Sequence, residues 1–363
     1  MKLIAQVKLQ PTEQQADALY RTILAYNEAA NYISDQAWMR KTFRKYDIHH
    51  ATYYAVRERF GLAAQLTIRV IANVADAYKL DTKTKRTFRK MGSITYDSRV
   101  LAWHLDNSEI SIWTLGGRQR MPFVCGKRQR KMLDSLQGEA DLVYRDSSYF
   151  LHQPCNILED EASEPEEWLG VDLGIVNIAT TSDGEIYTSN QVNNVRFRHR
   201  RLRTQLQRKG TKAAKRRLRK LSGKEQRFAT WVNHNISKRI VETAKRTEQG
   251  IALEELGGIR ERVRLRRSQR ATLHSWSFFQ LRTFIEYKAK LSGVPVVAVD
   301  PRNTSRTCPA CGCVDKKNRP SQETFSCTSC GHSGLADYIA SVNISRRAKV
   351  NWPYVSTTLK PAA

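Results

Sequence analysis

Two pairs of cysteines near the C-terminal end constrain the fold of this chain more than any other feature. Cys308 and Cys311 form one CxxC pair, and Cys327 and Cys330 form a second pair after fifteen intervening residues. This spacing is typical of a zinc ribbon, in which two tight turns each present two thiolates to one tetrahedral ion. Because four thiolates leave no position open for water, we expect one structural Zn²⁺ here.

The length and the charge of the chain favour a folded protein that binds a polyanion. Its 363 residues are enough for two or three domains, and a hydrophobic content of 40% argues against disorder. Lys and Arg number 61 against 35 Asp and Glu, which gives a formal net charge of +26. Nucleic acid is the usual partner of such an excess, because neutralised phosphates release counterions. The alternative is a basic protein that is merely soluble.

The sequence predicts no targeting or membrane segment. The first ten residues alternate apolar and polar side chains and lack the apolar core of a signal peptide. No apolar stretch has the length needed to cross a bilayer. Paired CxxC turns fit zinc in a reducing compartment better than a disulfide framework. We therefore expect a cytoplasmic protein without a membrane partner, with Cys125 and Cys155 as core or surface thiols.

The first half of the chain predicts helices followed by strands. A short strand over Leu3–Leu9 precedes a helix that opens with the capping-box pair Thr12 and Gln15. Apolar residues at helical spacing predict a second helical region from about His49 to Lys79. From Gly92 to Leu158, short β-branched runs separated by turns predict a small antiparallel barrel or sandwich, which the first strand could join.

The second half opens with an acidic side chain inside an apolar strand. An acidic linker over Glu159–Trp168 predicts a domain boundary, and a strand carrying Asp172, a glycine turn and a hairpin follow it. A carboxylate in such a strand is unfavourable unless it binds a metal or is paired. Asp172 is therefore a candidate ligand, although a lone aspartate in a strand is more often exposed at an edge.

Two basic segments predict contacts to a nucleic-acid backbone. Arg196–Arg227 holds fifteen Lys or Arg and one acidic residue, Glu225, and predicts a helical hairpin around Gly210, with a further helix over Phe228–Arg246. Arg260–Arg270 is the second segment. Like charges at helical spacing repel one another unless phosphates lie against them, although a charge run is usually a solvated face. The expected contacts are Arg196, Arg198, Arg201, Lys212, Lys215, Arg216, Arg219, Arg264 and Arg267.

Further carboxylates follow in the chain. A buried strand at Ile251–Leu253 ends in Glu254 and Glu255, at the strand end where active sites of open α/β sheets gather. Strand alternation alone does not choose between these glutamates. Asp337 stands after the second cysteine pair, at the start of a predicted helix.

An ordered set of carboxylates predicts a divalent metal site if the sheet brings its members together. Close carboxylates repel one another and stay ionised only if cations share them. Oxygen ligands with open water positions suit Mg²⁺ or Mn²⁺. Two such ions about 3.5–4 Å apart can activate water and stabilise the leaving 3′-oxygen of a phosphodiester. The alternative is that one or more of these residues is a surface acid.

Four strings together resemble a known family. They are GVDLGIVNIAT, IALEEL, HSWSFFQLRTFIEYKAKLSGVPVVAVDPRNTSRTCPACG and CxxCGHxxxADYIASVNI. They are similar to TnpB, the transposon-encoded ancestor of compact type V CRISPR effectors. The sequence similarity is strong throughout the second half of the chain and weaker in the N-terminal helix. In the predicted barrel, only the general pattern of short strands is similar.

The resemblance assigns the site residues. It implies that Asp172, Glu254 and Asp337 are catalytic and hold two Mg²⁺ or Mn²⁺ ions, so it selects Glu254 over its neighbour. It maps the four ribbon cysteines onto the zinc ligands and leaves Cys313 out. Many members carry Asn two residues after the final aspartate, where this chain has Ile339. That departure concerns a contact to the metal ligand and not the ligand itself.

The resemblance also implies a fold class, α/β plus β. It comprises an RNase H-like (RuvC) nuclease domain with an inserted zinc ribbon, preceded by a small β-barrel wedge domain with an inserted helical recognition lobe. The implied parts are the first wedge strand (1–10), the recognition lobe (11–90), the wedge barrel (91–158), a linker (159–167), the first part of the nuclease domain (168–303), the ribbon (304–333), the final nuclease helix (334–350) and a tail (351–363).

The implied function is that of an RNA-guided DNA endonuclease of a transposon. It would cleave double-stranded DNA next to a short target-adjacent motif, with a guide RNA from the transposon end reading the sequence. We expect a monomer, associated with the nucleoid in the cytoplasm of a prokaryote. Three alternatives stay open: an RNA-guided repressor that does not cut, a zinc-ribbon nucleic-acid-binding factor without enzymatic activity, and a DNA-strand transposase.

Overall fold

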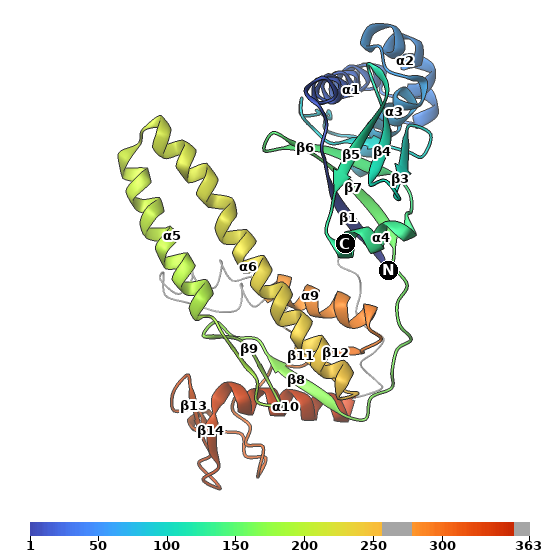
Figure 1. The fold of residues 1–363 in the computed structure, drawn as a ribbon. Coiled ribbons are helices and arrows are strands. Elements are labelled where there is room, and N and C mark those ends of the chain that lie inside the picture. Colours follow the sequence, from blue (N-terminus) through green and yellow to red (C-terminus); the bar gives the residue numbers. More distant parts are fainter. Residues whose placement is uncertain (256–277, 352–363) are drawn as a thin grey trace. The chain divides into compact units, whose positions relative to one another are not determined.

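The computed structural model describes residues 1–255 and 278–351, and they divide into two compact units, Met1–Leu158 and Glu159–Ala363 (Figure 1). Three predictions fall at least partly outside the described residues. These are the basic segment Arg260–Arg270, the contacts assigned within it to Arg264 and Arg267, and the tail after 351.

The first unit contains one antiparallel sheet of seven strands in the order β2-β6-β7-β1-β5-β4-β3. The N-terminal strand lies in its middle, paired with β7 from Lys2 opposite Asn156 to Lys8 opposite Phe150, and with β5 on its other side. The sheet is nearly closed, and its edge strands β2 and β3 do not pair with each other. The strands are β1 (Lys2–Leu9), β2 (Ile94–Tyr96), β3 (Leu101–His104), β4 (Glu109–Thr114), β5 (Gly117–Val124), β6 (Ala140–Arg145) and β7 (Ser148–Asn156).

Three helices pack in the same unit. The predicted capping box is confirmed at the start of α1 (Glu13–Arg40), where the Gln15 N–H donates to Thr12 Oγ1 and the Thr12 N–H donates to Gln15 Oε1. The expected second helical region is two helices, α2 (Lys45–Phe60) and α3 (Ala64–Leu80). Gly61 ends α2 because it adopts a left-handed φ of 65°, which a side chain would disfavour. A short α4 (Lys127–Met132) and a 3₁₀ turn, η1 (Leu133–Ser135), follow β5.

The second unit contains a mixed sheet of five strands in the order β10-β9-β8-β11-β12. β8, β11 and the edge strand β12 are parallel, and β9 runs antiparallel to both β8 and β10. β8 and β11 are buried on both faces except at their last residues, as expected for parallel strands covered on two sides. The strands are β8 (Trp168–Asp172), β9 (Asn177–Thr181), β10 (Ile186–Thr188), β11 (Gly250–Glu254) and β12 (Val296–Val299).

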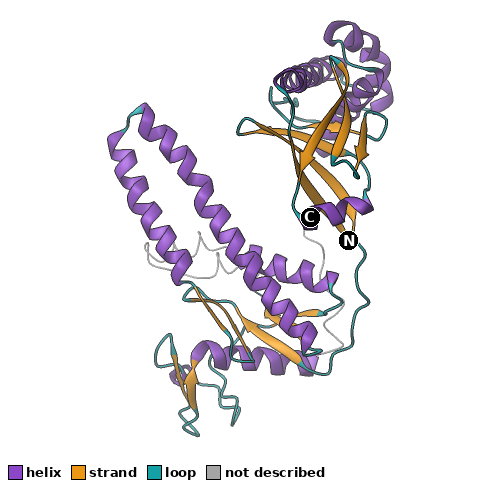
Figure 2. Cartoon of the chain, viewed as in Figure 1, coloured by secondary structure: helices purple, strands orange, loops and turns teal. Residues whose placement is uncertain are grey.

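Helices cover both faces of this sheet (Figure 2). Leu169 and Leu253 lie in one core cluster with apolar residues of α6 (Lys212–Arg246) and α9 (Phe278–Leu291). Trp168 and Ala252, which alternate with them, lie in another cluster with residues of α10 (Ala336–Asn351). Gly170 lets α10 lie directly on β8, since a Cβ at this position would come within 2.0 Å of the Ser341 carbonyl oxygen.

The basic region forms a long hairpin of α5 (Asn190–Lys209) and α6, with Gly210 in the left-handed conformation between them. The prediction of a separate helix from Phe228 to Arg246 was wrong, because α6 continues without a break from the hairpin into the core of the sheet. The ribbon contains η2 (Lys316–Asn318) and a two-stranded sheet of β13 (Thr324–Ser326) and β14 (Ser333–Leu335). No helix of the described residues has the length and apolar character needed to span a membrane.

Candidate active site and zinc site

The three predicted carboxylates come together at one end of the five-stranded sheet. Asp172 ends β8, Glu254 ends β11, and Asp337 lies in the first turn of α10. Leu253 pairs with Val171, so the two strand-end carboxylates follow at the same level. By alternation they face the same side as Trp168 and Ala252, which is the side that α10 covers. Strand register and helix packing therefore converge on one site.

Burial and mutual repulsion change the acidity of this site. Burial raises the pKa of Asp172 to about 8, and the nearby charges of Glu254 and Asp337 contribute to this rise. Burial also raises the pKa of Glu254, against the effect of the hydrogen bond that Thr304 donates to it. With a pKa of about 8, Asp172 is mostly neutral near pH 7 unless a cation lies beside it. The site thus has the electrostatic character of a cation site.

Three further residues hold these carboxylates in place. Thr304 Oγ1 donates to Glu254 Oε1 at 2.5 Å, and Asn177 Nδ2 donates to Asp337 Oδ2 at 2.9 Å. The Arg319 guanidinium lies 3.5 Å from Asp337 Oδ1. None of the three is predicted from the sequence. Asn177 and Thr304 stand inside strings that the resemblance uses, but neither string marks them as partners of a carboxylate. Nothing distinguishes Arg319 from the other polar residues around the cysteines.

The structure separates the two neighbouring glutamates. Glu255 accepts two hydrogen bonds of 3.0 Å from the Arg282 guanidinium, and half of its side chain is exposed. Glu254 instead lies half-buried near Asp172, where its charge raises the pKa of that carboxyl. Of the two, only Glu254 is placed to share a cation with the other carboxylates.

The four ribbon cysteines form the second candidate metal site. Their sulfur atoms all lie within 4.8 Å of one another, with 3.6 Å between Cys308 and Cys330 and 3.5 Å between Cys311 and Cys327. Tetrahedral Zn²⁺ with Zn–S bonds of about 2.3 Å would separate the sulfurs by about 3.8 Å, so the cluster fits this ion. Cys313 stands outside the cluster. Among the described residues, no other group of three or more such side chains is so tight, so the carboxylates lie further apart.

The predicted nucleic-acid contacts fall into two classes in the α5–α6 hairpin. Six of the seven that the structure describes are exposed: Arg198, Arg201, Lys212, Lys215, Arg216 and Arg219. The side chain of Arg196 is only 12% exposed and lies 3.8 Å from Glu225 of α6, which also forms an ion pair with Arg203. Glu225 therefore joins the two helices, and Arg196 stabilises the hairpin from inside.

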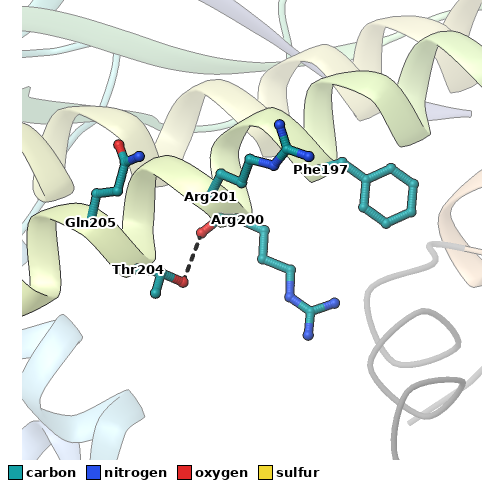
Figure 3. A pocket seen from close by; sticks show the side chains of 5 residues that line it. All are labelled: Phe197, Arg200, Arg201, Thr204 and Gln205. Carbon is teal, nitrogen blue, oxygen red and sulfur yellow. Dashed lines mark hydrogen bonds between the residues drawn. The ribbon is translucent and has the colours of Figure 1, made fainter.

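One open hollow of about 420 Å³ lies along α5. It is lined by Phe197, Arg200, Arg201, Thr204 and Gln205, whose side chains project from the helix in Figure 3. Phe197 is 58% exposed, and the lining contains no carboxylate and no thiol. The hollow is thus a basic and aromatic surface, separate from both candidate metal sites.

Comparison with known proteins gives two family matches. Residues 278–344 match a family described as Cas12f1-like, TNB domain, and residues 152–256 match one described as probable transposase, of the OrfB_IS605 type. The chain is 33% identical over 186 residues to the endodeoxyribonuclease Cas12f1 of Syntrophomonas palmitatica, covering 47% of this chain and 36% of that protein. It is 36% identical over 131 residues to a TnpB-like protein of Methanocaldococcus jannaschii, covering 36% and 46% of the two chains. The chain thus spans less than half the length of these curated relatives.

The fold gives an independent likeness. A Cas12f1 chain solved in complex with sgRNA and target DNA superposes with a TM-score of 0.60 at 15% identity, over 90% of this chain and 82% of that one. Sequence and fold agree, since the matched segments carry the strand-end carboxylates, the cysteines and the start of α10. Over these two segments, the chain is similar to proteins of the TnpB/Cas12f type.

Proposed function

We propose that this protein is an RNA-guided DNA endonuclease of a transposon, which cleaves double-stranded DNA next to a short target-adjacent motif. The observation that carries the proposal is the convergence of Asp172, Glu254 and Asp337 on one face of the sheet, with the pKa of Asp172 raised to about 8. Buried carboxylates that need a shared cation are the ligands of metal-dependent phosphodiester hydrolysis. The name of one curated relative, an endodeoxyribonuclease, supports DNA cleavage.

The second unit is proposed to be a RuvC nuclease domain of the RNase H-like fold. The strand order β10-β9-β8-β11-β12, with β8 and β11 parallel at its centre, supports this assignment. The zinc ribbon, 304–333, would be an insertion between β12 and α10. The seven-stranded sheet of the first unit would form the wedge domain, and α1 to α3 the recognition lobe inserted into it, with 159–167 as the linker.

The carboxylates are proposed to hold two Mg²⁺ or Mn²⁺ ions. When bound, the ions would supply activation of water and stabilisation of the leaving 3′-oxygen, which gives 5′-phosphate and 3′-hydroxyl ends. Thr304 would orient Glu254, and Asn177 would orient Asp337. Arg319 would offset the negative charge of Asp337. The same guanidinium would also offset the charge of a scissile phosphate bound beside it. The four cysteines would hold one structural Zn²⁺.

The partners are proposed to be a guide RNA from the transposon end and a double-stranded DNA target. The exposed basic residues of the α5–α6 hairpin would contact phosphates without reading bases. On α2, Tyr46 and Tyr54 are 73% and 81% exposed, and Arg57 lies 5.9 Å above the ring of Tyr53, which suits a lobe that grips nucleic acid. The protein would act as a monomer, in the cytoplasm and associated with the nucleoid.

The test is a cleavage assay with the purified protein and its co-purified RNA, whose sequence defines the target. Mg²⁺-dependent cutting of the matched duplex is expected, and it should require the RNA. Specific binding without cutting would instead identify a silent repressor, and strand joining a transposase. Absence of a defined co-purifying RNA, or cutting that does not need it, would contradict the proposal. In the former case, a zinc-ribbon nucleic-acid-binding factor becomes the better description.

A further inference from the structure

The zinc ribbon contacts two of the three carboxylates, through a residue at its start and a residue near its middle. Thr304, at its start, is 3% exposed and donates its hydroxyl to Glu254 at 2.5 Å. Arg319, which follows η2 in the ribbon, pairs with Asp337 at 3.5 Å and donates to the Gln322 carbonyl at 2.7 Å. The ribbon that carries the cysteines therefore also touches the carboxylate site at two points.

One buried asparagine holds the ribbon together beside these two points. Asn318 is fully buried and uses both ends of its amide. Its Nδ2 donates to the carbonyls of Arg306 and Cys313, at 3.0 and 3.1 Å. Its Oδ1 accepts from the N–H and the hydroxyl of Thr328, at 2.9 and 3.0 Å. This amide links the first cysteine turn to the second.

The ribbon is also fastened to the helix that carries Asp337. Asn343 of α10 is 5% exposed and donates to the carbonyls of Thr304 and Thr307, both at 2.8 Å. Ala336 and Ile339 of α10 lie in one buried cluster with Cys308, Phe325 and Cys327. The first turn of α10 is thus part of the core of the ribbon.

We propose that the zinc ribbon sets the divalent-cation affinity of the carboxylate site, with Asn318 as the positioning residue that couples the two metal sites. With the cysteine site filled, Asn318 fixes the cysteine turns, and these fix Thr304 against Glu254 and Arg319 against Asp337. Loss of zinc or of this amide releases both carboxylates from their positions. The inference rests on the proposed function for the identity of the cations, but it concerns binding and not cleavage.

Coupling of this kind has a measurable size. Residues that orient metal ligands by hydrogen bonds typically change metal affinity about 10- to 100-fold when replaced. We expect Asn318→Ala to raise the Kd for Mn²⁺ at the carboxylates about tenfold or more. Coupling between two binding sites is reciprocal. If bound zinc increases the affinity of the carboxylates for Mg²⁺ by some factor, bound Mg²⁺ must increase the affinity of the cysteines for zinc by the same factor.

The experiment measures both sides of this linkage on the full chain. Mn²⁺ affinity is followed by electron paramagnetic resonance, and zinc affinity by competition with a chromogenic chelator, with and without saturating Mg²⁺. In the wild type, Mg²⁺ should tighten zinc about tenfold, and in Asn318→Ala this factor should fall toward one. Asn235→Ala is the matched control, because Asn235 is exposed on α6 and its Nδ2 donates to the Trp231 carbonyl one turn away.

Each possible result either supports or refutes the coupling of the two sites. An Asn318→Ala protein that holds one zinc and binds Mn²⁺ as the wild type does would overturn the inference. If that variant does not retain zinc, Thr304→Val decides, because it leaves the cysteines and Asn318 intact and removes only the hydroxyl beside Glu254. Normal zinc with weakened Mn²⁺ then supports the inference, and unchanged Mn²⁺ refutes it. A wild type that shows the linkage but cuts no DNA would refute the proposed function alone.

Discussion

The cysteine site and the carboxylate site are two candidate metal sites of opposite construction. The first and last of the cysteines, Cys308 and Cys330, are only 22 positions apart, and they lie in small turns with little sheet around them. The carboxylates come from two strands and a helix, with 160 residues between Asn177 and its partner Asp337. A local site of thiolates can form together with its metal, whereas the carboxylate site requires a sheet that is already folded. A metal at the cysteines would stabilise the local fold. A metal at the carboxylates would bind to a site that the folded sheet has already formed.

The largest expected effect comes from removing the most buried carboxylate. Asp172→Ala should reduce cleavage of the matched duplex by at least about 10³-fold, because the cations lose a central ligand. RNA-directed binding of the target should persist, since the hairpin residues are unchanged. Cleavage and binding are measured in parallel, and Glu255→Ala is the control, because Glu255 faces Arg282. Cleavage by the Asp172→Ala variant would show that the carboxylate site is not the active site.

A change in the cysteine site should act through structure. Cys308→Ser is expected to lose zinc and with it most of the cleavage, because structural zinc sites contribute folding free energy directly. The helices and sheet of residues 1–158 should remain folded. Zinc content by mass spectrometry and hydrogen exchange of the two units would show this. Cys313→Ser, outside the cluster, should keep one zinc per chain; a loss of zinc there would mean that the ligands are misassigned.

The pH dependence of stability should reveal the carboxylate site in the absence of divalent cations. Burial raises the pKa of Asp172 from 3.8 to about 8 on folding, so the folded state binds more protons than the unfolded state between these values. The contribution of Asp172 to the free energy of unfolding should therefore be largest below about pH 4 and fall as the pH rises toward 8. Urea unfolding with a chelator present measures it. Asp172→Asn should flatten this slope, and an unchanged slope would assign the effect to other groups.

The smallest effect is expected from a residue that only orients a ligand. Asn177→Ala removes the amide donor to Asp337 and should raise the Mg²⁺ concentration for half-maximal cleavage about tenfold, with a smaller effect at saturating Mg²⁺. A Mg²⁺ titration of single-turnover cleavage separates these effects. Asn177→Asp is a useful contrast, because it replaces the donor with a second negative charge. An equal loss of cleavage rate at all Mg²⁺ concentrations would show that Asn177 does not act through the affinity of the site for Mg²⁺.

The same contrast explains what the sequence predicts and what it does not. The cysteine spacing is a local pattern, so it predicts the four-residue cluster directly. The choice between Glu254 and Glu255 needs the position of α10, because alternation only says that they face opposite sides. The pairing of Arg196 with Glu225 depends on how two helices meet, and charge density alone placed this arginine on the surface. Thr304 and Arg319 gain their roles only through tertiary contacts.

The boundaries of the helices also could not be predicted fully from the sequence. Gly61 divides one helical region into two because of a backbone conformation that the periodicity does not reveal. The continuity of α6 is a case in the other direction, since its basic first half and its apolar second half look like separate helices in sequence. Its second half is fixed by packing on the sheet, through residues such as Ile236, Ile240 and Ala244. Composition changes along such a helix because its surroundings change.

A single titration tests most directly whether the molecule contains two distinct metal sites. Wild type and Asp172→Ala, each purified with one zinc, are titrated with Mn²⁺ and followed by electron paramagnetic resonance. We predict that the wild type binds Mn²⁺ with an affinity that increases as the pH rises toward 8, because the cation must displace the proton of Asp172. The variant should keep its zinc and lose this binding. Equal Mn²⁺ binding by both proteins, or loss of zinc from the variant, would contradict the account.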